Sequence, residues 1–328
     1  MPLTHGDLSV GVDVGATNTR AAVVDPQATI LATANRLTPR GHKEGILESI
    51  LAAIQDALAV TGVERDRIAG VGVGIVGGVD IHSGMSTRSA NLGVAAIPVR
   101  LTVERALGLP CWLENDVRAA TIGELMFGAG QAFKHFVLLS VGTGIATGLV
   151  CNGRIYRGAG SLAGEFGHTT VDLHGAPCHC GQRGCLETYV SGPAIAAQAR
   201  ALAAHHPQST LAALLERGAG ALNATAVFHA AAQGDTLGLR ILDQVSHYLG
   251  AGIVNLYNLL DPEAIILGGG VFAQGDVLFE RLAREVEREY SVLTPRRLAL
   301  SRLGPAQVGV IGAASLVRYF TEVEPLSR

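Results

Sequence analysis

The sequence is short of charged, lysine and aromatic residues, and these shortages exclude classes of partner. Charged residues make up 16% of the 328 positions and aromatic residues 5%, the formal net charge is -3, and Lys43 and Lys134 are the only lysines. A protein that binds nucleic acid or a membrane surface through phosphates needs clustered Lys and Arg. No block of like charge occurs, so we expect neither partner and predict a small-molecule ligand.

The sequence also lacks a membrane-length apolar run and an even set of cysteines. Its N-terminus has no basic head followed by an apolar stretch, so we expect a cytoplasmic protein. The five cysteines are an odd number, and in a reducing compartment they favour metal ligation over a disulfide framework. Apolar residues make up 48%, which supplies substantial cores for two domains in a chain of this length.

Apolar patterning in the first third of the chain predicts an α/β layer. The stretches 8–14, 20–25 and 28–35 predict three strands joined by tight turns. Apolar residues at helical spacing over 44–58 predict a helix, and 68–76 predicts another strand. Strands around a helix in this order indicate an α/β fold.

A similar pattern returns later in the chain. Residues 136–156 predict a second set of strands, with a hairpin turn at Asn152-Gly153. A long amphipathic helix ends at Asp261-Pro262, and it is followed by a buried strand from residue 264 and a closing helix after residue 308. The repeat suggests two related halves.

Two Gly/Thr turns are candidate phosphate-binding loops. The first, "DVGATNTR", places Asp13 at a strand end, followed by Gly15 and Thr17; the second, "VGTGIATG", contains Gly142, Thr143 and Gly144. Glycine lets backbone amides approach an anion, and threonine adds a hydroxyl. Each alone is also compatible with a plain β-turn, but two equivalent loops can hold a polyphosphate from opposite sides.

Two further segments each allow a functional and a purely structural interpretation. The stretch "LGGG", with Gly268, Gly269 and Gly270, offers a surface for a base or ribose, or is a simple strand-to-helix turn. The Glu114-Asn115-Asp116 run lies between a predicted strand at 111–113 and a helix from Val117. It is compatible with helix N-capping, with a carboxylate placed to accept a proton, or with both.

Three of the five cysteines lie in one Gly-rich polar loop. Cys178, Cys180 and Cys185 have the spacing C-x-C-x4-C, and a disulfide between the first two would close a strained ring. A tetrahedral structural zinc site needs a fourth ligand, for which the candidates are His168, His174 and His179.

Motifs in a fixed order give the chain a resemblance to ROK proteins, the repressor, open-reading-frame and kinase family. They are "DVGATNTR", "ENDVRAA", "GTGIATG", "GEFGHTTVD", "CHCGQRGCLE" and "IILGGGV", and together they cover almost the whole chain. The resemblance implies an actin-like, ribonuclease H-like ATPase fold with two domains around a nucleotide and sugar cleft. It further implies a small domain at 1–116, joined by the C-terminal helix at about 313–328, and a large domain at 117–312 that carries the zinc loop.

The resemblance also implies site roles. Asp116 resembles the general base that takes a proton from the sugar hydroxyl, and the sugar-contacting positions match Asn91, Asn115, Asp116, Glu165, His168 and Glu187. His168 would bind zinc together with Cys178, Cys180 and Cys185. ATP and Mg²⁺ would lie against Asp13, Gly15, Thr17, Gly142, Thr143, Gly144, Gly268, Gly269 and Gly270.

The leading hypothesis is therefore an ATP-dependent glucokinase, with a homodimer or homotetramer expected from the resemblance. Alternatives are a kinase for N-acetylmannosamine, N-acetylglucosamine, mannose, fructose or allose, a donor such as polyphosphate, and a noncatalytic sugar-responsive regulator. ROK kinases usually have proline in the segment that is Val76-Gly77-Gly78 here, and often tryptophan after the Asn91-Leu92 pair. This chain has neither, and the difference leaves the identity of the sugar substrate undecided. Few residues precede the first predicted strand, so we expect no DNA-binding module there.

Overall fold

The computed structural model describes residues 7–218, 220–290 and 297–326. The chain forms two compact units. Unit 1 comprises Met1–His135, Gly148–Ala163 and Ser301–Arg328, and unit 2 comprises Phe136–Thr147 and Gly164–Leu300. The domain boundaries expected from the sequence, 1–116 and 117–312, stay a prediction.

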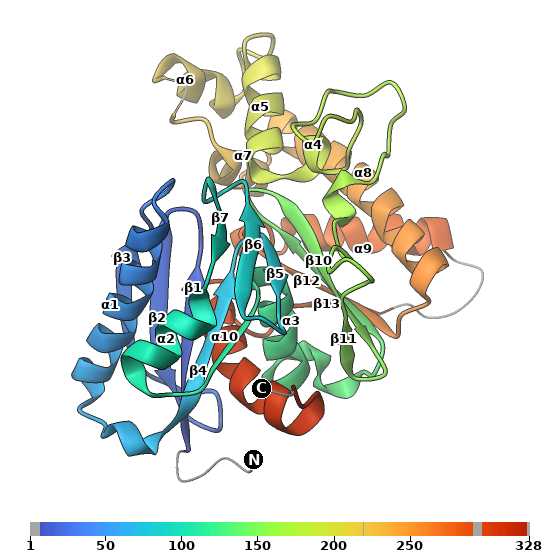
Figure 1. Cartoon of the computed structure of the whole chain (residues 1–328). Coiled ribbons are helices and arrows are strands. Elements are labelled where there is room, and N and C mark those ends of the chain that lie inside the picture. Colours follow the sequence, from blue (N-terminus) through green and yellow to red (C-terminus); the bar gives the residue numbers. More distant parts are fainter. Residues whose placement is uncertain (1–6, 219, 291–296, 327–328) are drawn as a thin grey trace. The chain divides into compact units, whose positions relative to one another are not determined.

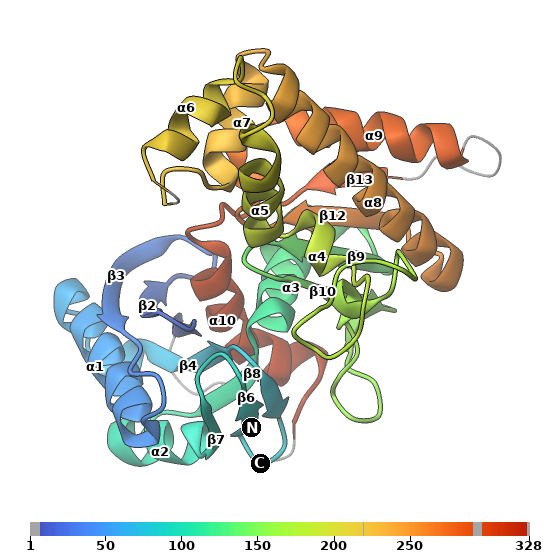
Figure 2. The same cartoon turned by 90° about the horizontal axis from the view of Figure 1, so that it is seen from above.

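The main sheet of unit 1 has the strand order β3-β2-β1-β4-β8. Strands β1 to β4 are labelled in Figure 1, and β8 is labelled in Figure 2. Strands β1, β2 and β3 form an antiparallel meander, and β4 and β8 continue the sheet in parallel with β1. Their bounds are Leu8–Val14, Asn18–Val24, Ile30–Leu37, Ile68–Ile75 and Cys111–Asn115. The strands predicted from apolar patterning are confirmed.

Helices cover both faces of this sheet. Figure 2 shows helix α1 (Lys43–Thr61) and helix α10 (Val308–Arg318) on opposite faces. Helix α2 spans Val99–Leu107, α3 spans Asp116–Phe127, and a π-helical turn at Tyr319–Val323 follows α10. Single 3₁₀ turns lie at Arg65–Arg67 and Ala129–Ala132.

Glycines let α10 lie directly on the sheet. A Cβ at Gly72 of β4 would lie 1.8 Å from the Ala313 carbonyl oxygen, and one at Gly11 of β1 would lie 2.0 Å from the Val310 carbonyl oxygen. Such distances are far below van der Waals contact, so no larger residue fits at either position. Gly11 and Gly72 are therefore a packing requirement of unit 1.

A small antiparallel sheet, β5-β6-β7, was not predicted. Its strands are Gly78–Asp80, Met85–Ser89 and Val94–Ile97. Strands β5 and β6 are short and rich in polar residues, and β7 is only four residues long, so they show no clear apolar alternation.

The second five-stranded sheet has the order β11-β10-β9-β12-β13, which repeats the order of the first. The strands span Arg154–Tyr156, Ile145–Cys151, Phe136–Val141, Ala264–Gly268 and Arg297–Leu300. The predicted turn between β10 and β11 is present, with Asn152 and Gly153 both at positive φ. The identical order supports the inference of two related halves.

The helices of unit 2 are α4 to α9, with bounds Glu187–Val190, Gly192–Ala203, Thr210–Glu216, Ala224–Ala232, Thr236–Leu260 and Val277–Tyr290. Short 3₁₀ turns lie at Phe166–His168 and Phe272–Gln274. Helix α8 ends as predicted, because Asp261 adopts a left-handed conformation before Pro262.

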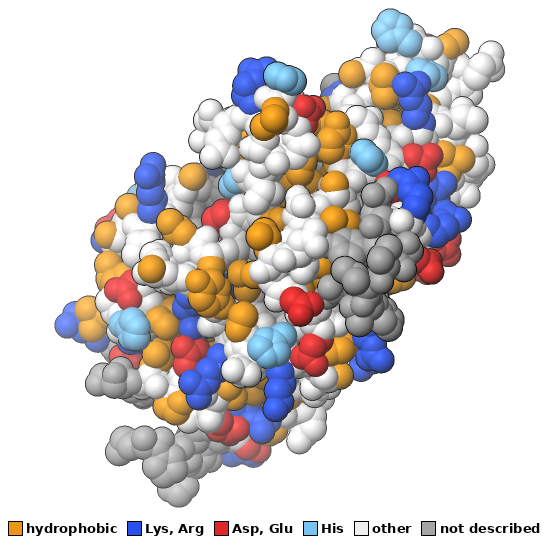
Figure 3. Space-filling model, turned by 90° about the vertical axis from the view of Figure 1, so that its right-hand side faces the viewer, with side chains coloured by type: hydrophobic (Ala, Val, Ile, Leu, Met, Phe, Trp, Pro, Cys, Tyr) orange, Lys and Arg blue, Asp and Glu red, His pale blue; other side chains and the backbone are white. Residues whose placement is uncertain are grey.

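The charges on the surface and the apolar character of the helices are the last features of the fold. Figure 3 shows a face on which acidic and basic side chains are interspersed. Within residues 7–218, 220–290 and 297–326, no helix combines the length and apolar character that crossing a membrane requires.

Candidate active site

In unit 1 the parallel strands bring Asp13 and Asp116 to the same edge of the sheet. Strands β1, β4 and β8 end in register, with Val14 beside Ile75 and Ile75 beside Asn115. Asp13 is the next-to-last residue of β1, and Asp116 is the first residue of α3, directly after β8. Polar groups at the carboxyl ends of parallel strands are in the usual position for a ligand site in α/β proteins.

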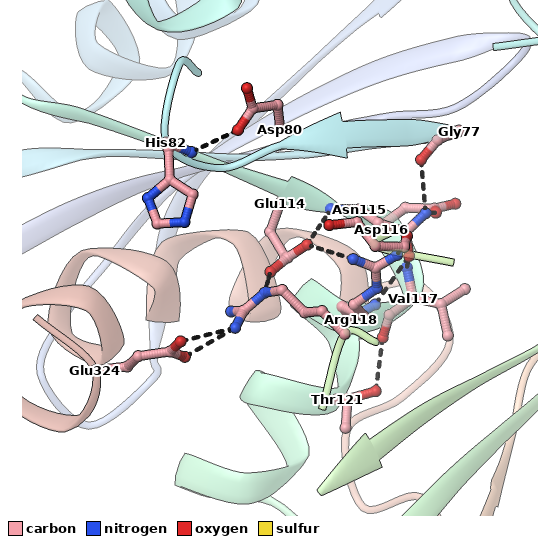
Figure 4. Close-up of polar contacts among 12 residues, drawn as sticks. Gly77, Asp80, His82, Glu114, Asn115, Asp116, Val117, Arg118, Thr121 and Glu324 are labelled. Carbon is pink, nitrogen blue, oxygen red and sulfur yellow. Dashed lines mark hydrogen bonds and ion pairs between the residues drawn. The ribbon is translucent and has the colours of Figure 1, made fainter. Parts of the chain in front are cut away.

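Asn115 caps α3 and also holds Asp116. Its side-chain oxygen accepts hydrogen bonds from the N–H groups of Val117 at 3.1 Å and Arg118 at 3.2 Å. Its amide nitrogen donates to Asp116 Oδ1 at 2.8 Å and to the Gly77 carbonyl at 3.2 Å (Figure 4). Capping and positioning of the carboxylate are therefore both present, as the sequence allowed.

The Asp116 carboxyl group has a strongly shifted pKa. Burial, together with the negative charge of Asp13, raises the pKa of Asp116 from 3.8 to about 6, against the opposing effect of hydrogen bonds that include the one from Asn115. Burial likewise raises the pKa of Asp13, although the charge of Arg20 opposes it. Asp116 is thus ionised at neutral pH and close enough to its pKa to accept a proton.

Glu114 anchors the turn that carries Asn115 and Asp116. Its side chain is completely buried, and Oε1 accepts a hydrogen bond from the Asn115 N–H at 2.9 Å. Arg157 Nε donates to Oε2 at 2.8 Å, and Arg118 lies 3.3 Å from Oε1. Arg157 also binds both carboxylate oxygens of Glu324, at 2.8 and 3.0 Å (Figure 4).

Sequence reasoning missed this cluster of four charges. Arg157 and Glu324 are separated by 167 positions in the chain, so spacing carries no signal for their contact. A glutamate in an otherwise apolar strand was the available clue, because a fully buried carboxylate requires a cationic partner.

The other unit 1 residues expected at the site are more exposed. The first Gly/Thr turn is closed by a hydrogen bond from the Gly15 N–H to the Asn18 carbonyl at 2.9 Å, and the Thr17 side chain faces solvent. Asn91 lies exposed in the turn between β6 and β7. Gly309 in the first turn of α10 was not predicted, and a side chain there would collide with the Asp13 carboxylate.

In unit 2 the second Gly/Thr loop and the glycine turn after β12 lie side by side. A Cβ at Gly142 would lie 3.9 Å from the Gly270 N–H nitrogen. Gly269 has a φ of 89°, and a Cβ there would lie 2.4 Å from the Val141 carbonyl oxygen, so glycine is required. Gly270 has open space around its Cβ position, which leaves backbone accessible to a ligand.

His168, Cys178, Cys180 and Cys185 form one group whose ligand atoms all lie within 4.8 Å of one another. Cys180 Sγ and Cys185 Sγ are 3.6 Å apart, and Cys178 Sγ is 3.7 Å from His168 Nδ1. A tetrahedron with Zn–S bonds of about 2.3 Å and Zn–N bonds of about 2.0 Å has edges of roughly 3.5 to 3.8 Å. The donor set and its spacing therefore fit zinc.

The structure also separates the three histidine candidates. His168 belongs to the group with the cysteines, whereas His174 does not. His179 forms a second group with His168 and Glu187. Burial raises the pKa of the Cys185 thiol to about 12, so a thiolate at this position requires a bound cation.

The two glutamates that frame the zinc loop differ in environment. Glu165 is exposed, and within the described part of the chain its carboxylate forms no hydrogen bond. Glu187 is partly buried and accepts a hydrogen bond from the Ile145 N–H at 2.9 Å. Ile145 directly follows the second Gly/Thr loop.

The family model of the ROK family matches residues 9–319. The chain belongs to the ROK family. It is 35% identical to a glucokinase of Halalkalibacterium halodurans over 94% of either chain. It is 26% identical to the xylose repressor of Bacillus subtilis, over 94% of this chain and 76% of the repressor.

Among solved structures, the ROK protein described here is similar to the ROK family glucokinase of Streptomyces griseus in complex with glucose and AMPPNP. The TM-score is 0.81 at 33% identity, and the match covers 95% of this chain and 99% of the other. This similarity confirms the predicted actin-like ATPase fold of mixed α/β type in two parts.

Proposed function

We propose that this ROK protein is an ATP-dependent sugar kinase that phosphorylates the 6-hydroxyl of glucose. The observation that carries the proposal is Asp116, a partly buried carboxylate with a pKa of about 6 at the carboxyl edge of the first sheet. The full-length similarity to glucokinases supports the substrate and the donor.

The proposed reaction is a single phosphoryl transfer. Asp116 accepts the proton of the sugar 6-hydroxyl while that oxygen forms a bond to the γ-phosphorus, and the bond to the ADP oxygen breaks. Asn115 holds Asp116 Oδ1 at 2.8 Å, which directs the carboxylate before substrate arrives. Positioning and charge neutralisation dominate such transfers, and a placed base contributes about 10²- to 10⁴-fold.

The proposed binding roles follow the match of each residue to the ROK motifs. Asn91, Asn115, Glu165, His168 and Glu187 are the proposed sugar contacts. The Gly15–Thr17 turn, the Gly142–Gly144 loop and the Gly268–Gly270 turn are proposed to bind the nucleotide. Asp13 offers the oxygen donors that Mg²⁺ prefers, and the ion would neutralise phosphate charge. Zinc at the four-residue group would order the loop that carries the sugar contacts.

A sugar panel tests this function. ADP release is measured with ATP and Mg²⁺ against glucose, mannose, fructose, allose, N-acetylglucosamine and N-acetylmannosamine. Protein with Asp116→Asn, purified identically, shows whether a contaminating host kinase produces the signal. We expect the highest kcat/KM with glucose. A higher kcat/KM with another sugar would assign that sugar as the substrate in place of glucose. Activity with polyphosphate would assign polyphosphate as the phosphoryl donor in place of ATP.

A sugar-responsive regulator is the second candidate, because the xylose repressor matches nearly the whole of this chain. It predicts that a sugar binds and that no tested donor supports turnover. Calorimetry with the same sugars, on protein shown to contain zinc, separates the two functions.

A further inference from the structure

Glu187 contacts two different groups through its two carboxylate oxygens. Oε2 accepts the hydrogen bond from the Ile145 N–H at 2.9 Å, and Oε1 lies 3.5 Å from His179 Nδ1. The Glu187 side chain is 13% exposed, whereas the His179 side chain is 76% exposed. One oxygen is therefore committed to the backbone inside unit 2, and the other faces the exposed His179 side chain.

The backbone that Glu187 holds belongs to the second Gly/Thr loop. Gly144 directly precedes Ile145, and a Cβ at Gly144 would lie 2.7 Å from Glu187 Oε2. Only glycine at position 144 leaves room for the Glu187 carboxylate to reach the loop, and this requirement is separate from any binding of phosphate. At the other end of the loop, the Gly192 N–H donates to the Gly142 carbonyl at 2.8 Å. The segment from Glu187 to Gly192 thus holds both ends of the loop.

Resting on the proposed function, we propose that Glu187 positions the phosphate-binding loop and thereby couples sugar binding to nucleotide binding. A hydrogen bond to an ionised acceptor is stronger than one between neutral groups, so it keeps the loop amides in place before ATP binds. A sugar hydroxyl that binds Oε1 restricts the same carboxylate and further orders the loop. Ligands that order the same segment bind cooperatively.

Glu165 provides a matched control. It occupies the other framing position of the zinc loop and is also a proposed sugar contact, yet its carboxylate holds no part of the phosphate loop. If both glutamates act only on the sugar, their alanine variants have the same effect on nucleotide binding. If Glu187 holds the loop, they differ.

The experiment measures AMPPNP binding with Mg²⁺ by calorimetry, without sugar and with saturating glucose, for wild type, Glu187→Ala, Glu187→Gln and Glu165→Ala. Without sugar we expect Glu187→Ala to bind AMPPNP about tenfold more weakly, which corresponds to about 1.4 kcal/mol. Glu165→Ala keeps wild-type AMPPNP affinity, and Glu187→Gln recovers most of it because an amide oxygen still accepts the Ile145 N–H.

The coupling itself is the ratio of AMPPNP affinities with and without glucose. At a glucose concentration shown to saturate each variant separately, we expect glucose to increase the AMPPNP affinity in wild type and in Glu165→Ala, and to leave it unchanged in Glu187→Ala. By linkage, AMPPNP increases the affinity for glucose by the same factor. Equal AMPPNP affinities for the two alanine variants, or a wild type without coupling, would overturn the proposal even if the protein phosphorylates glucose.

A measurement on the wild type alone covers the case in which Glu187→Ala does not fold. Hydrogen exchange of the Ile145 amide reports whether its hydrogen bond is kept. We expect glucose without nucleotide to slow this exchange. Unchanged exchange at saturating glucose would contradict the coupling.

Discussion

Replacing Arg157 by methionine tests the buried charge cluster that anchors the turn carrying Asn115 and Asp116. Methionine keeps an unbranched apolar side chain but lacks the guanidinium group, whose carbon lies 5.5 Å from the centroid of the Phe320 ring. The change leaves Glu114 with Arg118 as its single cationic partner among the ion pairs of the described structure. Glu324, which is 26% exposed, can recover water.

Removing one partner of a buried ion pair costs about 3–5 kcal/mol. Glu114 retains both the ion pair with Arg118 and the hydrogen bond from Asn115, so we expect the lower end, about 3 kcal/mol. For a unit of this size, 1 kcal/mol shifts the melting temperature by about 2–4 °C. The expected decrease is therefore roughly 6–12 °C.

The assay compares thermal and urea unfolding of Arg157→Met with a surface control in the same unit. Arg36 forms an ion pair with Asp56 at 2.6 Å, but the two side chains are 50% and 41% exposed. Arg36→Met should cost less than about 1 kcal/mol, as exposed pairs do. An Arg157→Met variant no less stable than Arg36→Met would refute the reasoning. In a double-mutant cycle, Glu324→Gln should cost less in the Arg157→Met background than in wild type.

Three further predictions concern acid–base chemistry, zinc and packing. The pKa of Asp116 is about 6 and its ionised form is the proposed base, so kcat/KM should decrease about tenfold per pH unit below 6. Asp13→Asn removes a charge that raises this pKa, so the residual activity of that variant should begin to decrease at a lower pH than in wild type. Metal analysis should give one zinc per chain, and Cys185→Ser should lose zinc and lower both the melting temperature and the glucose affinity; a zinc-free wild type would contradict the site. Gly72→Ala should cost more than about 3 kcal/mol because its Cβ would lie 1.8 Å from the Ala313 carbonyl oxygen, and near-wild-type unfolding would contradict the packing.

The sequence predicts the elements whose apolar pattern is strong. Strand β1 has the predicted bounds of Leu8–Val14, and α8 ends where Asp261-Pro262 requires it. Strands β5 and β6 could not be predicted, because "GVD" and "MSTRS" are short and polar and depend on pairing with one another. Local pattern is informative where a segment buries one face, and uninformative where a strand is defined by its partners.

For the site, the spacing of residues in the sequence indicates which residue types are present but not which of them lie together in the fold. The cysteine spacing predicts metal but cannot choose among His168, His174 and His179; folding of the loop brings His168 to the cysteines. The position of the Glu114-Asn115-Asp116 run after a predicted strand left capping and proton acceptance open, and the resemblance to ROK proteins indicated Asp116. The rise in the pKa of Asp116 depends on burial and on Asp13, which is distant in sequence. The contact of Arg157 with Glu324 was missed for the same reason, because the two residues are 167 positions apart in the sequence.

The measurement that tests the central claim most directly is kcat for glucose with ATP and Mg²⁺ in wild type and in Asp116→Asn, together with glucose affinity in both. Asn at this position still accepts the hydrogen bond from Asn115 but cannot take the proton. We predict that kcat decreases by about 10²- to 10⁴-fold while the glucose dissociation constant changes by less than about threefold. Turnover by Asp116→Asn within about tenfold of wild type would contradict its assignment as the general base.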